Sequence, residues 1–233
     1  SYEPKWDGFR ALAFRDRDEV VLQSRNGKEL GRYFPELFEA LRDELAERCV
    51  LDGEVVVPRE IDGRMRLDWE SLSQRIHPAE SRVRMLSEQT PAHFIGFDAL
   101  ATGDRSLLAE PFRVRREALI EAVRSKVWCH VTRTTTDPRL GAEWLQTFEG
   151  AGLDGVIAKP LTLTYQPDKR VMVKIKHQRT ADCVVAGYRL HKSGPDAVGS
   201  LLLGLYTDDG ELASVGVIGA FPMDRRRALF TEL

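Results

Sequence analysis

Short strand-like and helical runs alternate irregularly along the first 177 residues. Residues 9–16 and 19–25 predict a hairpin, because apolar and polar residues alternate on both sides of a charged turn. Apolar residues at helical spacing occur at 33–49, 110–124 and 139–152, and strand-like runs occur at 49–58, 93–100, 127–132, 155–159 and 171–176. The connections are short and do not form a regular βαβ repeat. We therefore predict an α+β domain of antiparallel sheets and helices over residues 1–177.

The composition changes near residue 178. Three strand-like runs follow at 181–190, 199–207 and 211–221, and the sequence TDDGE predicts a hairpin between the last two. This pattern predicts the first part of an all-β, oligonucleotide-binding (OB-fold) barrel over residues 178–233. Such a barrel needs about five strands. We therefore expect the barrel to be incomplete at Leu233 and both ends of the chain to be cut.

Composition excludes several classes of protein. The net charge of −2 gives no global basic signal, so nucleic-acid binding has to be inferred from local residues. The three cysteines are widely spaced and contain no CxxC pair, which disfavours a zinc site or a disulfide framework. No apolar run approaches the roughly 18 residues of a membrane span. We expect a soluble cytoplasmic protein with no membrane partner.

Charged residues stand at or near the ends of many predicted strands. The glycine-rich phosphate loop GxxxxGK[ST] does not occur, and the GxGxxG spacing at residues 150–155 comes at the end of a predicted helix and precedes a predicted strand, the reverse of the order in a dinucleotide-binding loop. Side chains would therefore have to bind any nucleotide. Each charge alone is consistent with a solvent-exposed strand face. Lys174 and Lys176 in VKIK are harder to explain in this way, because they point to one face of a strand otherwise made of valine and isoleucine.

Six short motifs occur in a fixed order along the chain. They are K-x-D-G-x-R, S-R-x-G, D-G-E, F-D, D-G-(apolar)₂-x-K and K-x-K. Together they resemble the nucleotidyltransferase motifs of ATP-dependent DNA ligases, in particular the bacterial C-type enzymes related to the ligase module of D-type repair ligases. The resemblance covers residues 2 to about 222. K-x-D-G alone is shared with capping enzymes and RNA ligases, so the ordered set carries the resemblance.

The resemblance implies that Lys5 is the nucleophile that attacks the α-phosphorus of ATP and becomes covalently bound to AMP. Only the neutral amine can attack, and an unperturbed lysine with a pKa of about 10.4 is almost entirely charged at pH 7. Neighbouring cations favour the neutral form, so Lys174 and Lys176 are expected to activate Lys5 and to neutralise the phosphate. Asp7 is expected to orient Lys5, and Gly8 to let the backbone approach the nucleotide.

The resemblance also implies how the rest of ATP is held. Arg10 and Arg25 would bind phosphate and later the 5′-phosphate of nicked DNA, as suits the planar fork of arginine. Phe97 would stack on adenine, and Glu3 would accept from its exocyclic amine. Further nucleotide contacts are implied for Pro4, Glu54 (to the ribose), Lys159, Arg170 and Arg115, although Arg116 beside Arg115 leaves that assignment open. Glu54 and Asp154 would be associated with the metal, but Asp154 stands where the family usually has glutamate. The family's tryptophan before K-x-K is missing.

We therefore predict a monomeric ATP-dependent DNA ligase that seals nicked double-stranded DNA. It would act through lysyl-AMP and DNA-adenylate with Mg²⁺ or Mn²⁺, which needs only two carboxylates near the phosphates. Two alternatives remain. One is another K-x-D-G nucleotidyltransferase, such as an RNA ligase or a capping guanylyltransferase. The other is a non-catalytic module that binds nucleotide or DNA.

Overall fold

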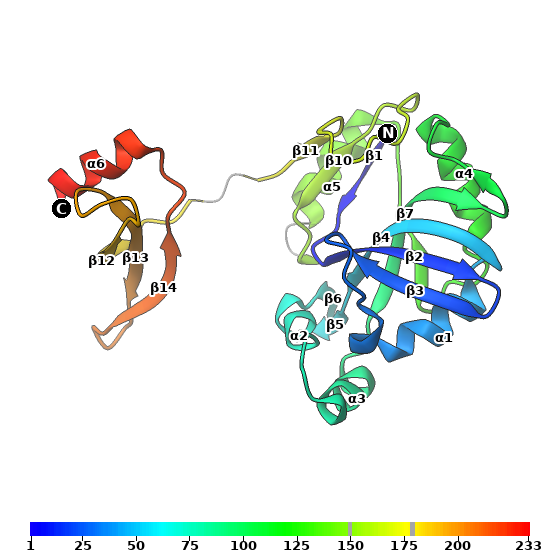
Figure 1. The fold of residues 1–233 in the computed structure, drawn as a ribbon, viewed down its shortest axis with the longest axis horizontal. Coiled ribbons are helices and arrows are strands. Elements are labelled where there is room, and N and C mark those ends of the chain that lie inside the picture. Colours follow the sequence, from blue (N-terminus) through cyan, green and yellow to red (C-terminus); the bar gives the residue numbers. More distant parts are fainter. Residues whose placement is uncertain (149–150, 178–179) are drawn as a thin grey trace. The chain divides into compact units, whose positions relative to one another are not determined.

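The computed structural model describes residues 1–148, 151–177 and 180–233. Contacts divide the chain into two compact units, Ser1–His177 and Gln178–Leu233, which are described separately. Figure 1 shows the first unit as a sheet-and-helix body and the second as a small sheet with one helix. The α+β class expected for the first unit is confirmed.

A six-stranded sheet forms the centre of the first unit. Its strands lie in the order β3-β2-β4-β7-β8, and β9 pairs with β7 in the parallel sense, whereas the other pairs are antiparallel. The bounds are β2 Phe9–Asp16, β3 Glu19–Ser24, β4 Arg48–Val56, β7 His93–Thr102, β8 Arg105–Ser106 and β9 Cys129–Val131. The sequence predicted most of these strands.

Helices cover one face of this sheet. Leu41 of α1 (Pro35–Glu44) and Leu119 of α4 (Phe112–Ala122) belong to the same buried cluster as Ala11 and Ala13 of β2. A short 3₁₀ helix, η1 (Gly31–Tyr33), precedes α1. Because side chains alternate along a strand, Arg10 and its i+2 neighbours lie on the opposite face. That face is free to carry a site.

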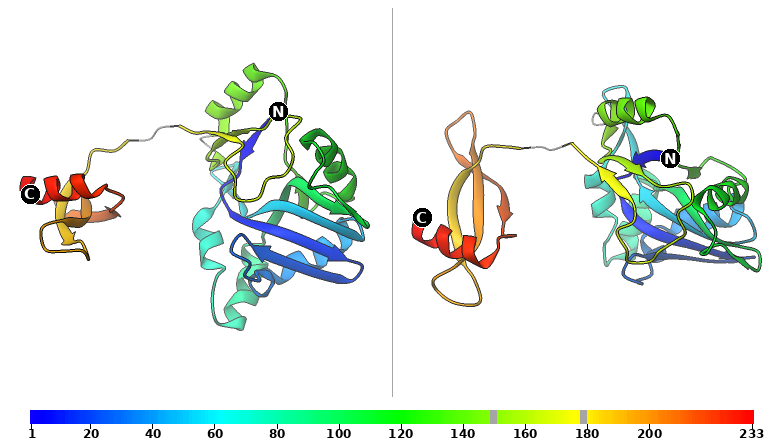
Figure 2. Two further views of the ribbon diagram at one scale, coloured as in Figure 1. Left: turned by 45° about the horizontal axis from the view of Figure 1, so that its top comes forward. Right: turned by 90° about the horizontal axis from the view of Figure 1, so that it is seen from above.

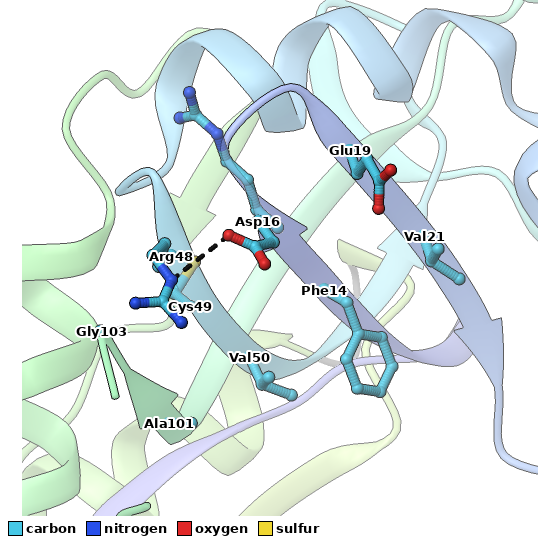
Figure 3. Close-up of a pocket in the computed structure, with 10 residues that line it drawn as sticks. Phe14, Asp16, Glu19, Val21, Arg48, Cys49, Val50, Ala101 and Gly103 are labelled. Atoms are coloured by element: carbon cyan, nitrogen blue, oxygen red, sulfur yellow. Dashed lines mark ion pairs between the residues drawn. The ribbon is translucent and has the colours of Figure 1, made fainter. Parts of the chain in front are cut away.

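The far end of this face carries a hollow lined by both apolar and charged side chains. Phe14 of β2 lies opposite Val21 of β3 and Val50 of β4. Asp16 and Arg48 form an ion pair of 3.2 Å at its edge, as Figure 3 shows. The hollow has a volume of about 240 Å³. None of the six motifs contributes a residue to its lining.

A second, three-stranded sheet carries the other half of the motifs. Its order is β1 (Tyr2–Lys5), β10 (Gly155–Ala158) and β11 (Val173–Ile175), all antiparallel. The helix α5 (Pro138–Phe148) packs against β1 and β10, and both views in Figure 2 show it beside this sheet. Part of the longer helix expected here, at 149–150, lies outside the described residues. The register brings the two ends of the first unit together, since Glu3 pairs with Ile157 and Lys5 with Gly155.

Several elements differ from the expectation. The helix α1 ends at Glu44 rather than at residue 49, because Leu45 is already extended, at φ −95° and ψ 166°. A hairpin of β5 (Pro58–Ile61) and β6 (Arg64–Leu67) and two helices, α2 (Trp69–Gln74) and α3 (Glu80–Gln89), were not predicted.

The second unit is a three-stranded antiparallel sheet with one helix. Its elements are β12 Val184–Leu190, β13 Val198–Tyr206, β14 Leu212–Ile218 and α6 Met223–Glu232. The three expected strands are present and the described strands do not close into a barrel, but α6 was not predicted. Leu229 of α6 packs on Val198 and Leu201 of β13. Among the described helices, none is long and apolar enough to cross a membrane.

Candidate active site

Lys5 stands at the end of β1 beside a carboxylate and a second lysine. Its Nζ donates to Oδ2 of Asp154, and Lys176 Nζ donates to the same oxygen at 2.8 Å. Burial raises the pKa of Asp154, but the hydrogen bonds from Lys176 and Lys5 outweigh this and hold the pKa below its usual value. The hydrogen bond to Asp154 raises the pKa of Lys176. Asp154 therefore neutralises part of the positive charge around Lys5.

Lys174 lies in a cluster of cations. Burial lowers its pKa first, and then Lys5, Arg25 and Arg10 lower it further by charge repulsion. Three motifs that are separate in the sequence therefore contribute positive charge to one place. Such a concentration of cations suits a polyphosphate ligand.

Two more carboxylates face this cluster. Burial, and next the negative charge of Asp154, raises the pKa of Asp7. Burial raises the pKa of Glu54 to about 8, although Lys5 and Arg10 oppose the shift. Both carboxylates thus lie where water is scarce and where additional positive charge would stabilise their ionised forms.

At the opposite end of β1, a buried ion pair lies beside an aromatic ring. Glu3 Oε1 and Lys159 Nζ form a buried ion pair of 2.6 Å, while Glu3 Oε2 is buried and has no hydrogen-bond partner among the described residues. Burial raises the pKa of Glu3 against the effect of Lys159. The ammonium of Lys159 lies 5.0 Å from the ring centroid of Phe97. An unpaired acceptor beside a half-buried aromatic ring fits a flat ligand with an amine at its edge.

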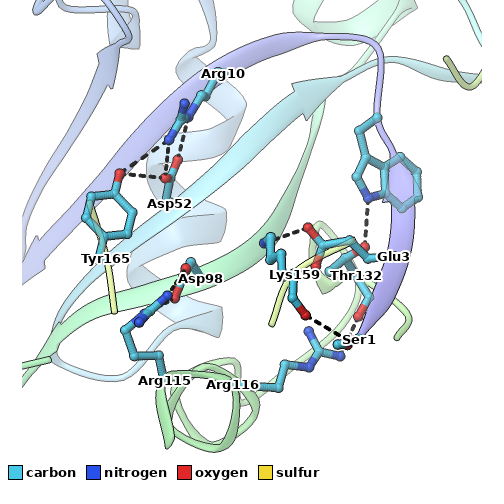
Figure 4. Close-up of polar contacts among 11 residues, drawn as sticks. Ser1, Glu3, Arg10, Asp52, Asp98, Arg115, Arg116, Thr132, Lys159 and Tyr165 are labelled. Atoms are coloured by element: carbon cyan, nitrogen blue, oxygen red, sulfur yellow. Dashed lines mark hydrogen bonds and ion pairs between the residues drawn. The ribbon is translucent and has the colours of Figure 1, made fainter. Parts of the chain in front are cut away.

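Arg10 is held against the central sheet, as Figure 4 shows. Its Nε and Nη2 donate to the two oxygens of Asp52 at 3.0 and 2.6 Å. Tyr165, in the loop between β10 and β11, donates its hydroxyl to Asp52 Oδ2 at 2.9 Å. The hydrogen bonds to Asp52 raise the pKa of Arg10. The guanidinium carbon lies 5.9 Å from the ring centroid of Phe97.

The two neighbouring arginines of α4 occupy different environments. Arg115 is 2% exposed and forms a two-point ion pair with Asp98, at 2.7 and 2.9 Å. It also donates to the carbonyl oxygens of Glu110 and Leu163. Arg116 donates to the carbonyl of Thr132, but its buried Nε and Nη1 have no partner among the described residues. Burial lowers the pKa of Arg116, and Glu3 opposes this shift. Arg116 therefore has more free hydrogen-bonding capacity toward the pocket than Arg115.

The other residues predicted for the site are less closely connected to the side chains described above. Arg25 and Arg170 are exposed, and Arg170 has no hydrogen bond or ion pair among the described contacts. Strand alternation turns the side chain of Pro4 away from the face that carries Glu3 and Lys5. A Cβ on Gly8 would overlap the carbonyl oxygen of Val55, so the close approach that requires glycine is to β4. This is a different reason from the expected approach to the nucleotide.

Three residues of the site were not predicted from the sequence. Tyr165 joins the Arg10–Asp52 pair, Thr132 accepts from Trp6 Nε1 at 2.9 Å, and Trp6 itself lies beside Lys5. A tyrosine in the loop between two motif strands is a weak signal that could have pointed to Tyr165.

The carboxylates near Lys5 fit a magnesium ion. The described residues contain no group of three or more His, Cys, Asp or Glu side chains placed as a metal cage. Magnesium keeps most of its waters and takes one or two protein carboxylates, so a cage is not required. The raised pKa values of Asp7 and Glu54 and the location of Asp154 beside them indicate a place where a cation would be stabilised.

Comparisons with known proteins agree with this geometry. The family model described as the ATP dependent DNA ligase domain matches residues 1–176. The chain is 75% identical over its whole length to DNA ligase C1 of Mycolicibacterium smegmatis, of which it covers 67%. It is 63% identical to DNA ligase C of Mycobacterium tuberculosis and covers 65% of that protein. The chain thus spans about two thirds of the length of these relatives.

Solved structures of DNA ligases are also similar to this chain. The ligase domain of M. tuberculosis LigD superimposes with a TM-score of 0.57 at 31% identity, over 99% of this chain and 70% of that one. A mycobacterial DNA ligase D in complex with ATP matches over the same shares, with a TM-score of 0.56 and 31% identity. The ordered motifs, the converging lysines and these matches lead to one conclusion: the chain belongs to the ATP-dependent DNA ligase family.

Proposed function

We propose that this protein is an ATP-dependent DNA ligase that seals nicks in double-stranded DNA, with Lys5 as the covalent AMP acceptor. The observation that carries this proposal is the convergence of Lys5, Lys174 and Lys176 at one end of β1, while Glu3, in the same strand, pairs with Lys159 beside the ring of Phe97. A site that only binds adenine has no need for an amine surrounded by cations.

The first step transfers AMP to the enzyme. The neutral amine of Lys5 attacks the α-phosphorus, a P–N bond forms, the bond to the β-phosphate oxygen breaks, and pyrophosphate leaves. Lys174 and Arg10 stabilise the negative charge that develops on the phosphate. Asp7 and Asp154 are the carboxylates that can hold the Lys5 ammonium before its proton is lost.

The second and third steps use the same pocket. The 5′-phosphate at the nick attacks lysyl-AMP to form DNA-adenylate and regenerate Lys5, and the 3′-hydroxyl then attacks the activated phosphate, forms the phosphodiester and releases AMP. Arg10 and the exposed Arg25 would hold the DNA phosphate. Mg²⁺ or Mn²⁺ bound near Glu54 and Asp154 would supply Lewis-acid stabilisation of the phosphate charge.

The remaining assignments follow from this function. We assign residues 1–177 to the adenylation domain and 178–233 to part of an OB-fold domain, with the boundary residue 178 outside the described residues. Glu3, Phe97 and Lys159 would bind adenine and Glu54 the ribose. Pro4 would contribute through its backbone, Arg115 by supporting the pocket, and Arg170 by reaching the phosphates from the surface. We infer that the enzyme acts as a monomer on chromosomal DNA in the cytoplasm.

The test is the intact mass of the protein after incubation with ATP and Mg²⁺. We expect a gain of one AMP, located on Lys5 by peptide mapping and absent in Lys5→Ala. Labelling by GTP instead would indicate a capping guanylyltransferase. A protein that never gains AMP under these conditions, while still binding ATP, would be a non-catalytic binding module.

A further inference from the structure

We propose that Tyr165 is a positioning residue that sets which carboxylate Arg10 pairs with, and thereby aims Arg10 at the substrate phosphate. This inference rests on the proposed function, in which Arg10 binds phosphate. Tyr165 belongs to none of the six motifs that define the site.

Arg10 has two carboxylates within reach on the neighbouring strand. In the register of β2 and β4 it lies directly opposite Glu54, while Asp52 is opposite Leu12. Directly opposed side chains in an antiparallel pair are closer than diagonal ones. An unaided Arg10 would therefore pair readily with Glu54. In the structure it forms both of its ion-pair hydrogen bonds with the diagonal neighbour, Asp52.

Tyr165 supplies the reason for this choice. Its hydroxyl donates to Asp52 Oδ2 at 2.9 Å and lies 3.3 Å from Arg10 Nη2, which donates to it. Asp52 is 1% exposed, so its charge needs several donors, and Tyr165 and Arg10 together provide them. Burial, and next the charge of Asp52, raises the pKa of Tyr165, which keeps its hydroxyl in the donating form.

The loop that carries Tyr165 is itself held in place. Leu163 accepts from Arg115 Nη1 at 2.8 Å, and the Tyr165 amide donates to the carbonyl of Leu108 at 3.0 Å. The guanidinium of Arg115 lies 5.8 Å from the centre of the Tyr165 ring. Figure 4 shows the Arg10–Asp52 pair on one side of Tyr165 and the Arg115–Asp98 pair on the other. The hydroxyl is therefore fixed by groups that do not touch the substrate.

Two consequences follow for the substrate. Arg10 remains 40% exposed although Asp52 is buried, and its Nη1 has no partner among the described residues. A guanidinium fixed along one edge presents the other edge in one orientation, which lowers the entropy lost when it binds a phosphate. Glu54 also stays free of Arg10 for its own role at the ribose or the metal.

The experiment compares Tyr165→Phe with Tyr33→Phe, since the described contacts give the Tyr33 hydroxyl no hydrogen bond. Full-length protein is loaded with AMP, and its dissociation constants are measured for nicked duplexes that carry a 5′-phosphate or a 5′-hydroxyl. The dissociation constant of the 5′-hydroxyl duplex divided by that of the 5′-phosphate duplex reports how strongly the protein binds the phosphate. Losing one hydrogen bond to a charged group predicts that Tyr165→Phe lowers this ratio about fivefold or more. Tyr33→Phe is expected to leave the ratio unchanged, and thermal unfolding is measured in parallel.

A second comparison separates positioning from a merely structural role. Arg10→Lys already removes the planar guanidinium that Tyr165 would position. Adding Tyr165→Phe to this variant is therefore expected to have little further effect on the ratio. An equal additional loss in that background, or an unchanged ratio in Tyr165→Phe alone, would overturn the inference. A wild-type protein that takes no AMP on Lys5 would instead overturn the proposed function, and this inference with it.

Discussion

Lys5 and Asp154 form an ion pair that joins the end of β1 to the residue before β10. The backbone amide of Asp154 also donates to the carbonyl of Lys5 at 3.0 Å, so the two residues are fixed to each other at both backbone and side chain. An ion-paired lysine is an ammonium, which cannot attack phosphorus. The structure therefore shows a resting arrangement from which Lys5 has to be released.

Asp154→Asn is expected to change both the pH and the Mg²⁺ concentration at which adenylylation is fast. A neutral amide no longer favours the ammonium of Lys5, so the pH optimum of AMP transfer should move to lower pH. Loss of a metal-associated carboxylate should raise the Mg²⁺ concentration needed for half-maximal rate. Both are measured from the rate of the mass gain, with Asp18→Asn in an exposed turn as the control. An unchanged pH profile would show that Asp154 does not hold the proton on Lys5.

Lys174→Ala and Lys176→Ala should each slow adenylylation more than tenfold, which corresponds to about 1.4 kcal/mol or more of transition-state stabilisation. The loss should be greatest at low pH if the two lysines help to activate Lys5. The structure adds a distinction, because Lys176 is paired with Asp154 and Lys174 is surrounded by cations. Lys174→Ala should therefore cost more affinity for ATP. Wild-type rates in both variants would show that these lysines only form the solvent-exposed face of their strand.

Glu54→Gln should stabilise the folded protein, and more so at alkaline pH. The folded pKa of Glu54, about 8, lies above its unfolded value of 4.5. Between these values the folded state holds a proton that the unfolded state releases, so stability declines as pH rises from about 4.5 to 8 and is level above that. The gain in Tm from Glu54→Gln should thus be larger at pH 8 than at pH 5. Glu60→Gln, at an exposed position, should give no such difference.

How far the sequence predicts this structure depends on the kind of element. The hairpin of β2 and β3 and the strands of the motifs were predicted because their apolar residues alternate or run together. The hairpin of β5 and β6 was not predicted, because a proline such as Pro58 is typical of a strand end and the run that follows is mostly charged. Its signal was present in Asp62-Gly63, where both residues have positive φ, at 53° and 71°.

The site was predicted as a set of residues but not as a set of contacts. The family resemblance names Glu3 and Lys159, yet nothing in the sequence shows that their side chains pair, because the pairing depends on the register of β1 against β10. The same holds for Arg10, whose choice of Asp52 over Glu54 depends on Tyr165. Long-range packing decides such contacts, and local patterns do not encode it.

Arg115→Met is expected to destabilise the fold rather than act first on nucleotide binding. It would leave the carboxylate of Asp98, which is 6% exposed, without its partner. Breaking a buried ion pair on one side costs about 3–5 kcal/mol in the free energy of unfolding. Arg84→Met removes the exposed pair with Glu80 and should cost less than about 1 kcal/mol. Denaturant unfolding measures both. Equal effects would mean that Arg115 is not a structural anchor.

Glu3→Gln should weaken the preference for ATP over GTP. Glu3 Oε1 is occupied by Lys159, whereas Oε2 is buried without a partner among the described residues, so it can accept from the amine of adenine. Guanine presents a carbonyl oxygen at the corresponding position, which the carboxylate would repel. Glutamine keeps an oxygen for Lys159 and offers an amide that can donate to that carbonyl. A site built around one hydrogen bond rejects a mismatched base because a buried polar group is left unpaired, so we expect the ratio of adenylylation to guanylylation rates to fall about tenfold or more. Glu117→Gln, on the exposed side of α4, is the control. An unchanged ratio in Glu3→Gln, with the fold intact by circular dichroism, would assign base selectivity to other groups of the pocket.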